Sequence, residues 1–286
     1  MPSVPTGPAE EAGISDPLAR PILIVGPPRS GARLLAQALK AVPSCWTIAG
    51  APGALLSAVP ELDPPDGSRG GRLVATDCRP DVQQQLHSRL RAEFEVRETQ
   101  VVRAAPRLFD ASPRNALLVP FLQDAFPDAT FVYVDRDPAD SLAESLAIWQ
   151  AGTAVTYPEL PNWIGRSWSF LLVPGWEELI GSPLAEIVTE QWVRTMRILT
   201  ADLEALAPHQ WCVTHYDALC ASPHAELNRL LRFVGLAPPT WSDLLLDDSL
   251  PSLVRGAAEA ARAELDPYLQ RTRELADHAR GWVAHV

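Results

Sequence analysis

The residues best suited to bind an anion stand together at Gly26–Gly31, where the chain reads Gly-Pro-Pro-Arg-Ser-Gly. Two glycines bound the segment, and Arg29 and Ser30 place a cation and a hydroxyl between them. A short loop that leads into a helix directs free N–H groups and the positive end of the helix dipole at a bound anion. The loop indicates a phosphate or sulfate site. The plainer interpretation is a strand, a turn and a helix that bind nothing.

Two strand–loop–helix units must position these groups. Ile22–Val25 is a short apolar run typical of a buried strand, and helical spacing of apolar residues follows the loop. Thr130–Val134 is a second such strand, followed by Arg136 and a predicted helix over 139–150. These units predict an α/β fold with a central, mostly parallel sheet flanked by helices, and the two strands adjacent at its centre. Arg29 and Arg136 are then expected together, at the carboxyl ends of the strands.

The loop does not have the residues of a nucleotide-hydrolysing P-loop. Gly26 and Gly31 have the G-x-x-x-x-G spacing, but Ala32 and Arg33 stand where that motif requires Lys and then Ser or Thr. The Lys would contact the phosphates and the hydroxyl would bind Mg²⁺. An ATPase, a GTPase or a nucleotide kinase is therefore disfavoured.

Composition limits the classes of partner. The chain has 286 residues, a hydrophobic content of 47% and a formal net charge of −11. This content is enough for a core, and the acidic balance disfavours a nucleic-acid-binding protein, which would show a basic stripe. Lys40 is the only lysine, so arginine must be the cation at any anion site. With no long apolar run and no metal-binding cysteine pattern, we expect a cytoplasmic protein without a bound metal or membrane association.

The chain is expected to form one domain over 21–286, preceded by a flexible tail at 1–20. Residues 152–183 are rich in Trp and Pro and are interpreted as a lid. Trp163, Trp168 and Trp176 would offer a flat apolar wall to a hydrophobic acceptor, or would only fix the segment to the core. Residues 257–284 are expected to be one helix, which packs on the sheet or on a second copy in a homodimer.

Four segments, in order along the chain, resemble the sulfotransferases that use 3′-phosphoadenosine 5′-phosphosulfate (PAPS). Pro28–Leu35 is similar to their 5′-phosphosulfate loop, roughly P-[KR]-S-G-T-[TS]-L-L. Phe109–Leu122 is similar to the bacterial E-K-[TS]-P-x-N segment, and Phe131–Trp149 to the 3′-phosphate segment R-D-P-R-[DE]-x-x-x-S. Trp211–Leu236 is similar to a C-terminal signature of the family. The resemblance implies a P-loop-like sulfotransferase fold.

The resemblance also implies roles for single residues. Arg29 would lie beside the leaving oxygen, and Ser30 and Gly31 would bind the 5′-phosphosulfate. Arg136 would pair with the 3′-phosphate through its fork of N–H groups, unless it only forms a surface ion pair with Asp135 or Asp137. Asp110 matches the carboxylate of the E-K-[TS]-P segment and would take the proton of the acceptor. The weaker candidates for this base are His87, also a candidate contact of the substrate, and His215.

The chain departs from the family pattern at the anion contacts. Ala32 and Arg33 replace the hydroxyl pair after the loop glycine, although Arg33 could supply charge there. Glu144 stands eight residues after Arg136, in the place of the family's 3′-phosphate serine, and Ser145 follows. A carboxylate there would repel the phosphate, unless a shifted helix register brings Ser145 round. The family's lysine in the E-K-[TS]-P segment is also lost, since Ala111 stands there.

We therefore expect an enzyme that transfers a sulfuryl group from PAPS to a hydroxyl of a small molecule, such as a specialised metabolite. The desulfated donor, PAP, is then released. The alternative is an enzyme on the same fold that has lost PAPS and performs acid–base isomerisation, elimination or cyclisation. A third hypothesis is a non-catalytic binding protein that uses the Trp-rich lid as a contact surface.

Overall fold

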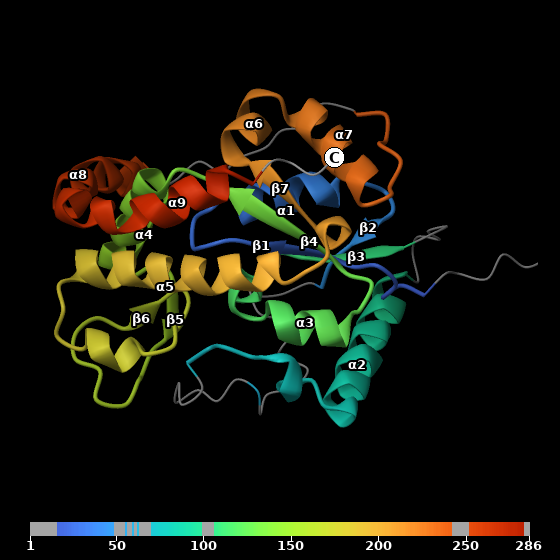
Figure 1. Ribbon diagram of the computed structural model, residues 1–286, viewed down its shortest axis with the longest axis horizontal. Coiled ribbons are helices and arrows are strands. Elements are labelled where there is room, and N and C mark those ends of the chain that lie inside the picture. The colour runs from blue at the N-terminus through green and yellow to red at the C-terminus, as the bar shows by residue number, and fades with distance from the viewer. Residues whose placement is uncertain are drawn as a thin grey trace, which may run out of the picture.

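The computed structural model describes residues 16–48, 55, 59, 62, 70–98, 106–241 and 252–282 (Figure 1). A parallel sheet of five strands, in the order β2-β3-β1-β4-β7, lies at the centre of the described part. Its strands are β1 (Ile22–Val25), β2 (Cys45–Trp46), β3 (Arg107–Asp110), β4 (Thr130–Asp135) and β7 (Trp211–His215). The predicted α/β fold is confirmed.

The predicted central pair of strands is also confirmed. β1 and β4 run parallel, with Ile22 opposite Thr130 and Val25 opposite Tyr133. All four residues of β1 are buried, because alternate side chains enter two separate cores. The adjacent positions of β1 and β4 bring the loops that follow them to one edge of the sheet.

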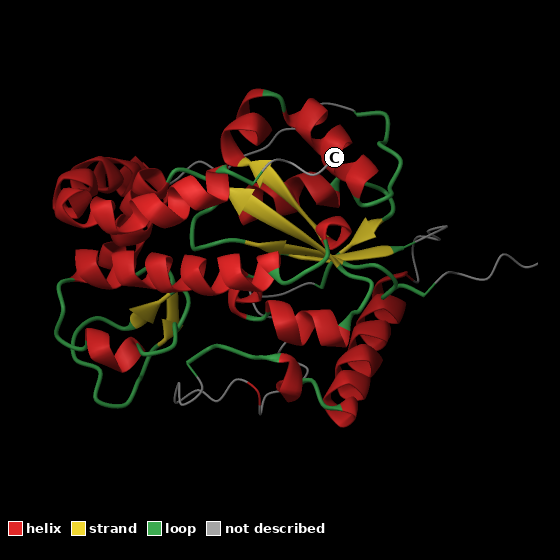
Figure 2. Cartoon of the chain, in the orientation of Figure 1, coloured by secondary structure: helices red, strands yellow, loops and turns green. Residues whose placement is uncertain are grey.

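Helices cover both faces of the sheet (Figure 2). In the view of Figure 1, α1, α6 and α7 lie above the sheet, and α3 and α5 lie below it. Leu34 of α1 and Leu230 of α7 share a core with Ile24, whereas Leu122 of α3 and Leu199 of α5 share the other with Leu23. The helices of the main body are α1 (Ala32–Lys40), α2 (Pro80–Glu98), α3 (Val119–Ala125), α4 (Pro138–Ala151), α5 (Leu184–Glu204), α6 (Tyr216–Ala221) and α7 (Pro223–Phe233).

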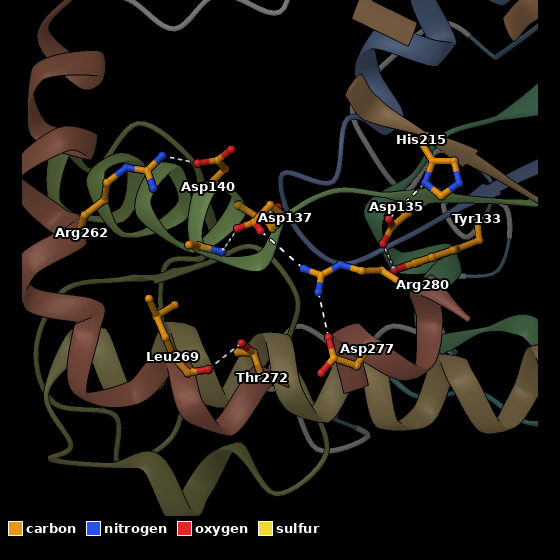
Figure 3. A network of polar contacts seen from close by, with 12 residues as sticks. Tyr133, Asp135, Asp137, Asp140, His215, Arg262, Leu269, Thr272, Asp277 and Arg280 are labelled. Carbon is orange, nitrogen blue, oxygen red and sulfur yellow. Dashed lines mark hydrogen bonds and ion pairs between the residues drawn. The ribbon is translucent and has the colours of Figure 1, made fainter. Parts of the chain in front are cut away.

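The C-terminal segment forms two helices rather than the single one predicted over 257–284. α8 (Ser252–Leu269) packs on α4 and α5, and a turn at Gln270–Thr272 separates it from α9 (Arg273–Arg280). The hydroxyl of Thr272 donates to the Leu269 carbonyl oxygen at 2.8 Å, a local bond that competes with continuation of the helix (Figure 3). The predicted homodimer stays a prediction.

The predicted tail is partly wrong, because its last residues pack on the domain. Leu18 is buried, and the Pro17 carbonyl accepts a hydrogen bond from the Trp46 indole at 3.1 Å. The Arg20 amide donates to the Asp128 carboxylate at 2.8 Å. Residues 1–15 lie outside the described residues, so the prediction of a flexible tail is not tested there. None of the described helices combines the length and the apolar character that crossing a membrane requires.

Candidate active site

The loop after β1 has the backbone of an anion cradle. The Arg29 backbone is left-handed, with a φ of 63°, and the Ser30 amide donates to the Pro27 carbonyl at 3.1 Å. Gly31 begins α1 with a φ of 104°, a conformation that favours glycine. The Ser30 Oγ atom is buried and has no hydrogen-bond partner among the described residues. A buried hydroxyl without a partner is costly, so it marks a place where a ligand oxygen would be accommodated.

The Glu144 carboxylate lies between the two arginines that the sequence assigns to the donor. Arg29 approaches Glu144 Oε2 with its Nε at 2.8 Å and its Nη2 at 2.7 Å. Arg136 donates from Nη2 to Oε1 at 2.6 Å and from Nη1 to Oε2 at 3.1 Å. The exposed fractions of these side chains are only 15% for Arg29 and Glu144 and 8% for Arg136. Glu144 therefore neutralises part of the charge at the very place predicted for the 3′-phosphate.

Arg136 also positions the loop itself. Its Nη1 donates to the Arg29 carbonyl oxygen at 2.9 Å, which helps to hold the left-handed residue in place. The guanidinium stacks over the Tyr216 ring, 4.0 Å from the centroid, and the same ring covers Gly31. The ion pair of Arg136 with Glu144 is largely buried, since only 8% of the arginine side chain is exposed, so a surface ion pair does not by itself account for its position.

Ser145 follows Glu144 on α4, but its hydroxyl bonds to its own helix rather than to this cluster. Its side chain is buried, and its hydroxyl donates to the Ser141 carbonyl oxygen at 2.7 Å. The suggestion that a shifted register brings Ser145 to the anion is wrong for this conformation, because the family register directs Glu144 there instead. At the start of α1, Ala32 is half-buried and Arg33 is exposed. The roles of Ala32 and Arg33 toward a phosphosulfate stay predictions.

Asp110 ends β3 beside β1, with Leu23 opposite it in the register. The carboxylate accepts from Asn115 Nδ2 at 2.8 Å and from the Ser112 amide at 3.1 Å. Asn115 also donates to the Ile24 carbonyl at 3.2 Å, so it links the carboxylate to β1. Burial raises the pKa of the Asp110 carboxyl, although both hydrogen bonds oppose the shift. A carboxylate with a raised pKa among neutral donors is suited to accept a proton.

His215 ends β7 at the same edge of the sheet (Figure 3). Its Nδ1 lies 3.2 Å from the Asp135 carboxylate, which also accepts a hydrogen bond from the Tyr133 hydroxyl at 3.3 Å. The bond with Asp135 raises the pKa of the His215 imidazole. Burial, together with Asp135, raises the pKa of the Tyr133 phenol well above its ordinary range. Next to them, Arg280 of α9 pairs with Asp137, which caps α4.

His87 lies away from this edge, which corrects its assignment to the substrate pocket. Its Nε2 is 2.8 Å from the Ala125 carbonyl, and its ring stacks on Phe126 at 5.0 Å. Both partners precede β4, whereas Arg136 follows β4. A strand of six residues separates the two ends by about 20 Å. His87 therefore supports the packing of α2 on α3.

The three lid tryptophans pack on one another. Their segment contains an antiparallel pair, β5 (Val155–Tyr157) and β6 (Trp168–Ser169). The ring centroids of Trp163 and Trp168 are 4.9 Å apart, and those of Trp168 and Trp176 are 6.0 Å apart. Trp168 and Trp176 are buried, and Trp163 is half-buried. In this conformation, Trp168 and Trp176 form the core of the segment, and Trp163 alone has surface to offer an acceptor.

Two residues of the site were missed by the sequence interpretation. Tyr216 stands in the quoted C-terminal signature but was given no role, and it covers both Gly31 and Arg136. Asn115 stands in the quoted E-K-[TS]-P-x-N segment, and it orients Asp110. For both residues, the only indication of a role in the site was that each stands in a family motif. Neither residue type by itself pointed to a function.

The chain belongs to the sulfotransferase family. A family profile described as "Sulfotransferase family" matches residues 21–243, which includes every strand of the central sheet. No curated protein sequence matches the chain.

Solved sulfotransferase structures share the fold. The sulfotransferase domain from the curacin biosynthetic pathway is 17% identical, with a TM-score of 0.50, and the match covers 94% of this chain and 93% of that domain. A sulfotransferase from Alicyclobacillus acidocaldarius is 17% identical, with a TM-score of 0.51 and coverages of 91% and 96%. The sulfotransferase domain from the Synechococcus PCC 7002 olefin synthase is 15% identical, with a TM-score of 0.50 and coverages of 93% and 97%.

The residues present suit one end of the family's donor and oppose the other. Arg29, the buried Ser30 hydroxyl and the N-terminus of α1 suit a 5′-phosphosulfate. At the 3′-phosphate, the family's serine is replaced by a carboxylate that already contacts Arg136. Within the described residues, no group of three or more His, Cys, Asp or Glu side chains is arranged to hold a metal ion.

Proposed function

We propose that the enzyme transfers a sulfuryl group from a nucleoside 5′-phosphosulfate, the class to which PAPS belongs, to a hydroxyl of a small molecule. The observation that supports this most directly is that an anion-binding loop and a buried carboxylate lie at the ends of two neighbouring strands. The cradle with Arg29 and the unpartnered Ser30 hydroxyl follows β1, and the buried Asp110 ends β3. Similar folds in the curacin pathway and in an olefin synthase favour a specialised metabolite as acceptor.

Each residue has a stated task in this proposal. Asp110 accepts the proton of the acceptor hydroxyl, and Asn115 holds the carboxylate in place. The Arg29 guanidinium stabilises the charge that develops on the leaving oxygen. The Ser30 hydroxyl and the N–H groups at the start of α1 bind the phosphosulfate oxygens. Trp163 is kept as a contact of a hydrophobic acceptor.

The test removes the cation at the leaving oxygen. Arg29→Ala is expected to lower the transfer rate by a factor of about 10³ or more, because it removes the cation assigned to the charge that develops on the leaving oxygen. Transfer of labelled sulfate from PAPS, and from its analogue without the 3′-phosphate, to a panel of phenols and alcohols measures the rate. Arg91→Ala is the control, since Arg91 is a half-exposed residue of α2 paired with Asp16. If Arg29→Ala transfers sulfate as fast as the wild type, the assigned role is wrong.

A second candidate is acid–base chemistry without any sulfate donor, such as isomerisation, elimination or cyclisation. The observation that favours it is Glu144, whose carboxylate contacts both candidate donor arginines. In that case Asp110 would transfer a proton on a substrate bound beside it. The two candidates differ in a simple measurement, because only the sulfotransferase binds an adenosine 5′-phosphate.

A further inference from the structure

Glu144 takes the position and the negative charge of the predicted 3′-phosphate. Its carboxylate lies within 2.8 Å of Arg29 Nε and within 2.6 Å of Arg136 Nη2. A carboxylate and a phosphate are bound by arginine through the same fork of N–H groups. The protein itself therefore supplies the anion that these two arginines would otherwise take from a ligand.

The charge left at this place is too small for a phosphate. Arg29 and Arg136 contribute two positive charges, and Glu144 offsets one of them. A phosphate monoester has about 1.5 to 2 negative charges near neutral pH. Placing it beside Glu144 would bring like charges together in a site where the three side chains are at most 15% exposed, and such contacts oppose binding.

The same carboxylate is well suited to a hydroxyl. An ionised carboxylate only accepts hydrogen bonds, and each of its oxygens has two acceptor positions. Oε2 receives both Arg29 and Arg136, whereas Oε1 receives Arg136 Nη2 and retains a position for one more donor. Dinucleotide-binding proteins show the same choice, because an acidic residue binds a ribose hydroxyl and an arginine accommodates a ribose phosphate.

We propose that Glu144 selects a donor with a free 3′-hydroxyl, namely a nucleoside 5′-phosphosulfate such as adenosine 5′-phosphosulfate (APS), over PAPS. This inference rests on the proposed sulfuryl transfer. Glu144 stays between the two arginines, and its carboxylate accepts a hydrogen bond donated by the 3′-hydroxyl. The Ser30 hydroxyl and the N–H groups at the start of α1 remain with the 5′-phosphosulfate, and Arg29 lies between the two ends of the donor, where it also contacts Glu144.

The reaction that follows is balanced without another reactant. The acceptor oxygen forms a bond to sulfur while the bond between sulfur and the bridging oxygen breaks. The electron pair of that bond goes to the leaving phosphate oxygen, which gives adenosine 5′-monophosphate (AMP). The acceptor's proton goes to Asp110, and the acceptor leaves as a sulfate ester.

The test is calorimetric titration of the full chain with AMP and with PAP, the products that correspond to APS and PAPS. AMP is expected to bind the wild type about tenfold or more tightly than PAP. Glu144→Ser and the isosteric Glu144→Gln are expected to reverse this preference, because both remove the negative charge. Asp202→Asn is the matched control, since Asp202 of α5 forms a similarly buried pair with Arg72, and it should leave the ratio unchanged.

The possible outcomes separate the inference from the proposed function. Equal binding, or tighter binding of PAP by the wild type, overturns the inference and leaves sulfuryl transfer from PAPS. A ratio that favours AMP and does not respond to either Glu144 variant also overturns the role of Glu144. Failure of both nucleotides to bind the wild type overturns the proposed function itself and favours the donor-free chemistry. The wild-type ratio needs no variant, so the test does not depend on the folding of Glu144→Ser.

Discussion

Two carboxylates flank β1 at the same edge of the sheet, and their surroundings differ. Asp110, at the end of β3, receives neutral donors from Asn115 and the Ser112 amide, and burial raises the pKa of its carboxyl. Glu144, on the helix that follows β4, contacts the guanidinium groups of Arg29 and Arg136. One carboxylate is arranged to exchange a proton, and the other is arranged to remain a fixed charge. The difference separates the chemistry from donor recognition.

Of the changes that test the difference between these two carboxylates, removal of the proton acceptor is expected to have the largest effect. Asp110→Asn should lower the transfer rate by about 10²- to 10⁴-fold, because general-base catalysis is lost while the amide can still receive Asn115. The binding of AMP or PAP should change little, since Asp110 does not touch the donor site in this assignment. Steady-state rates and calorimetry on the same preparation measure both. A large loss of nucleotide binding in Asp110→Asn would show that Asp110 also takes part in donor binding, contrary to the separate roles assigned to Asp110 and Glu144.

The same residue should give activity and stability opposite dependences on pH. Because the folded pKa of Asp110 is raised above the ordinary value, the folded state keeps a proton that the unfolded state has lost. As pH rises from the ordinary value through the raised pKa, the stability from this group is lost, by about 1.4 kcal/mol for each pKa unit of the shift. The rate should rise over the same interval, as the base becomes ionised.

Denaturant unfolding and pH–rate profiles of the wild type and Asp110→Asn test this relation. The difference in unfolding free energy between the two proteins should change with pH in that interval, and the corresponding limb of the rate profile should be absent in the variant. A rate limb that survives in Asp110→Asn would assign the base to another group, such as His215.

A smaller effect is expected from restoring the family's hydroxyls on the donor side. In a Glu144→Ser protein, which should already bind PAP more tightly than the wild type, adding Ala32→Thr and Arg33→Thr should tighten PAP binding further, by about tenfold, because two donors to charged oxygens are gained. In the wild-type background the same two changes should tighten PAP binding by a similar factor, because contacts at the 5′-phosphate and at the 3′-phosphate contribute nearly additively to the binding free energy. Calorimetry with PAP on the four proteins measures both steps. No gain in either background would show that positions 32 and 33 do not face the 5′-phosphate.

The smallest effect is expected at His215, which contacts Asp135 rather than Asp110 or Glu144. Its raised pKa contributes stability that is complete below the unfolded value near 6.5 and is lost as pH rises through the folded pKa. The side chain is 45% exposed, so screening keeps the effect well below 1 kcal/mol. Urea unfolding of the wild type and His215→Gln, about two pH units on either side of ~6.5, should show the larger difference at low pH. A difference that is independent of pH would assign the effect to packing.

The central strands and the position of Glu144 could be predicted from the sequence because both follow from local pattern. The apolar run at Ile22–Val25 can be buried on both faces only inside a sheet. Glu144 stands at a fixed helical distance from Arg136, so a helix after β4 brings it to the anion. The sequence predicted repulsion between the Glu144 carboxylate and a 3′-phosphate. It did not show that Arg29 would contact Glu144, because the direction of the Arg29 side chain depends on its left-handed backbone.

The errors arose where tertiary packing decides. His87 lies on a helix whose own pattern is clear, yet the placement of that helix against Ala125 and Phe126 depends on residues far along the chain. The lid has no periodicity, so nothing in the sequence showed that Trp168 would be buried against its neighbours. At the turn after α8, the Thr272 hydroxyl donates to the Leu269 carbonyl oxygen, a local bond that the helical spacing of apolar residues does not reveal.

The contact between Gly31 and Tyr216 limits the mutational routes by which this site could change its anion. A Cβ atom at position 31 would lie 2.4 Å from the Tyr216 ring, and the φ of 104° would strain any other residue even if the ring were trimmed. Replacement of Gly31 is therefore opposed by two independent factors, a clash with the Tyr216 ring and backbone strain. A single compensating substitution would not remove both. We expect the donor site to change instead at positions where a new side chain leaves the loop backbone as it is. Ala32, Arg33 and Glu144, where this chain departs from the family pattern, are the positions at which we expect such change.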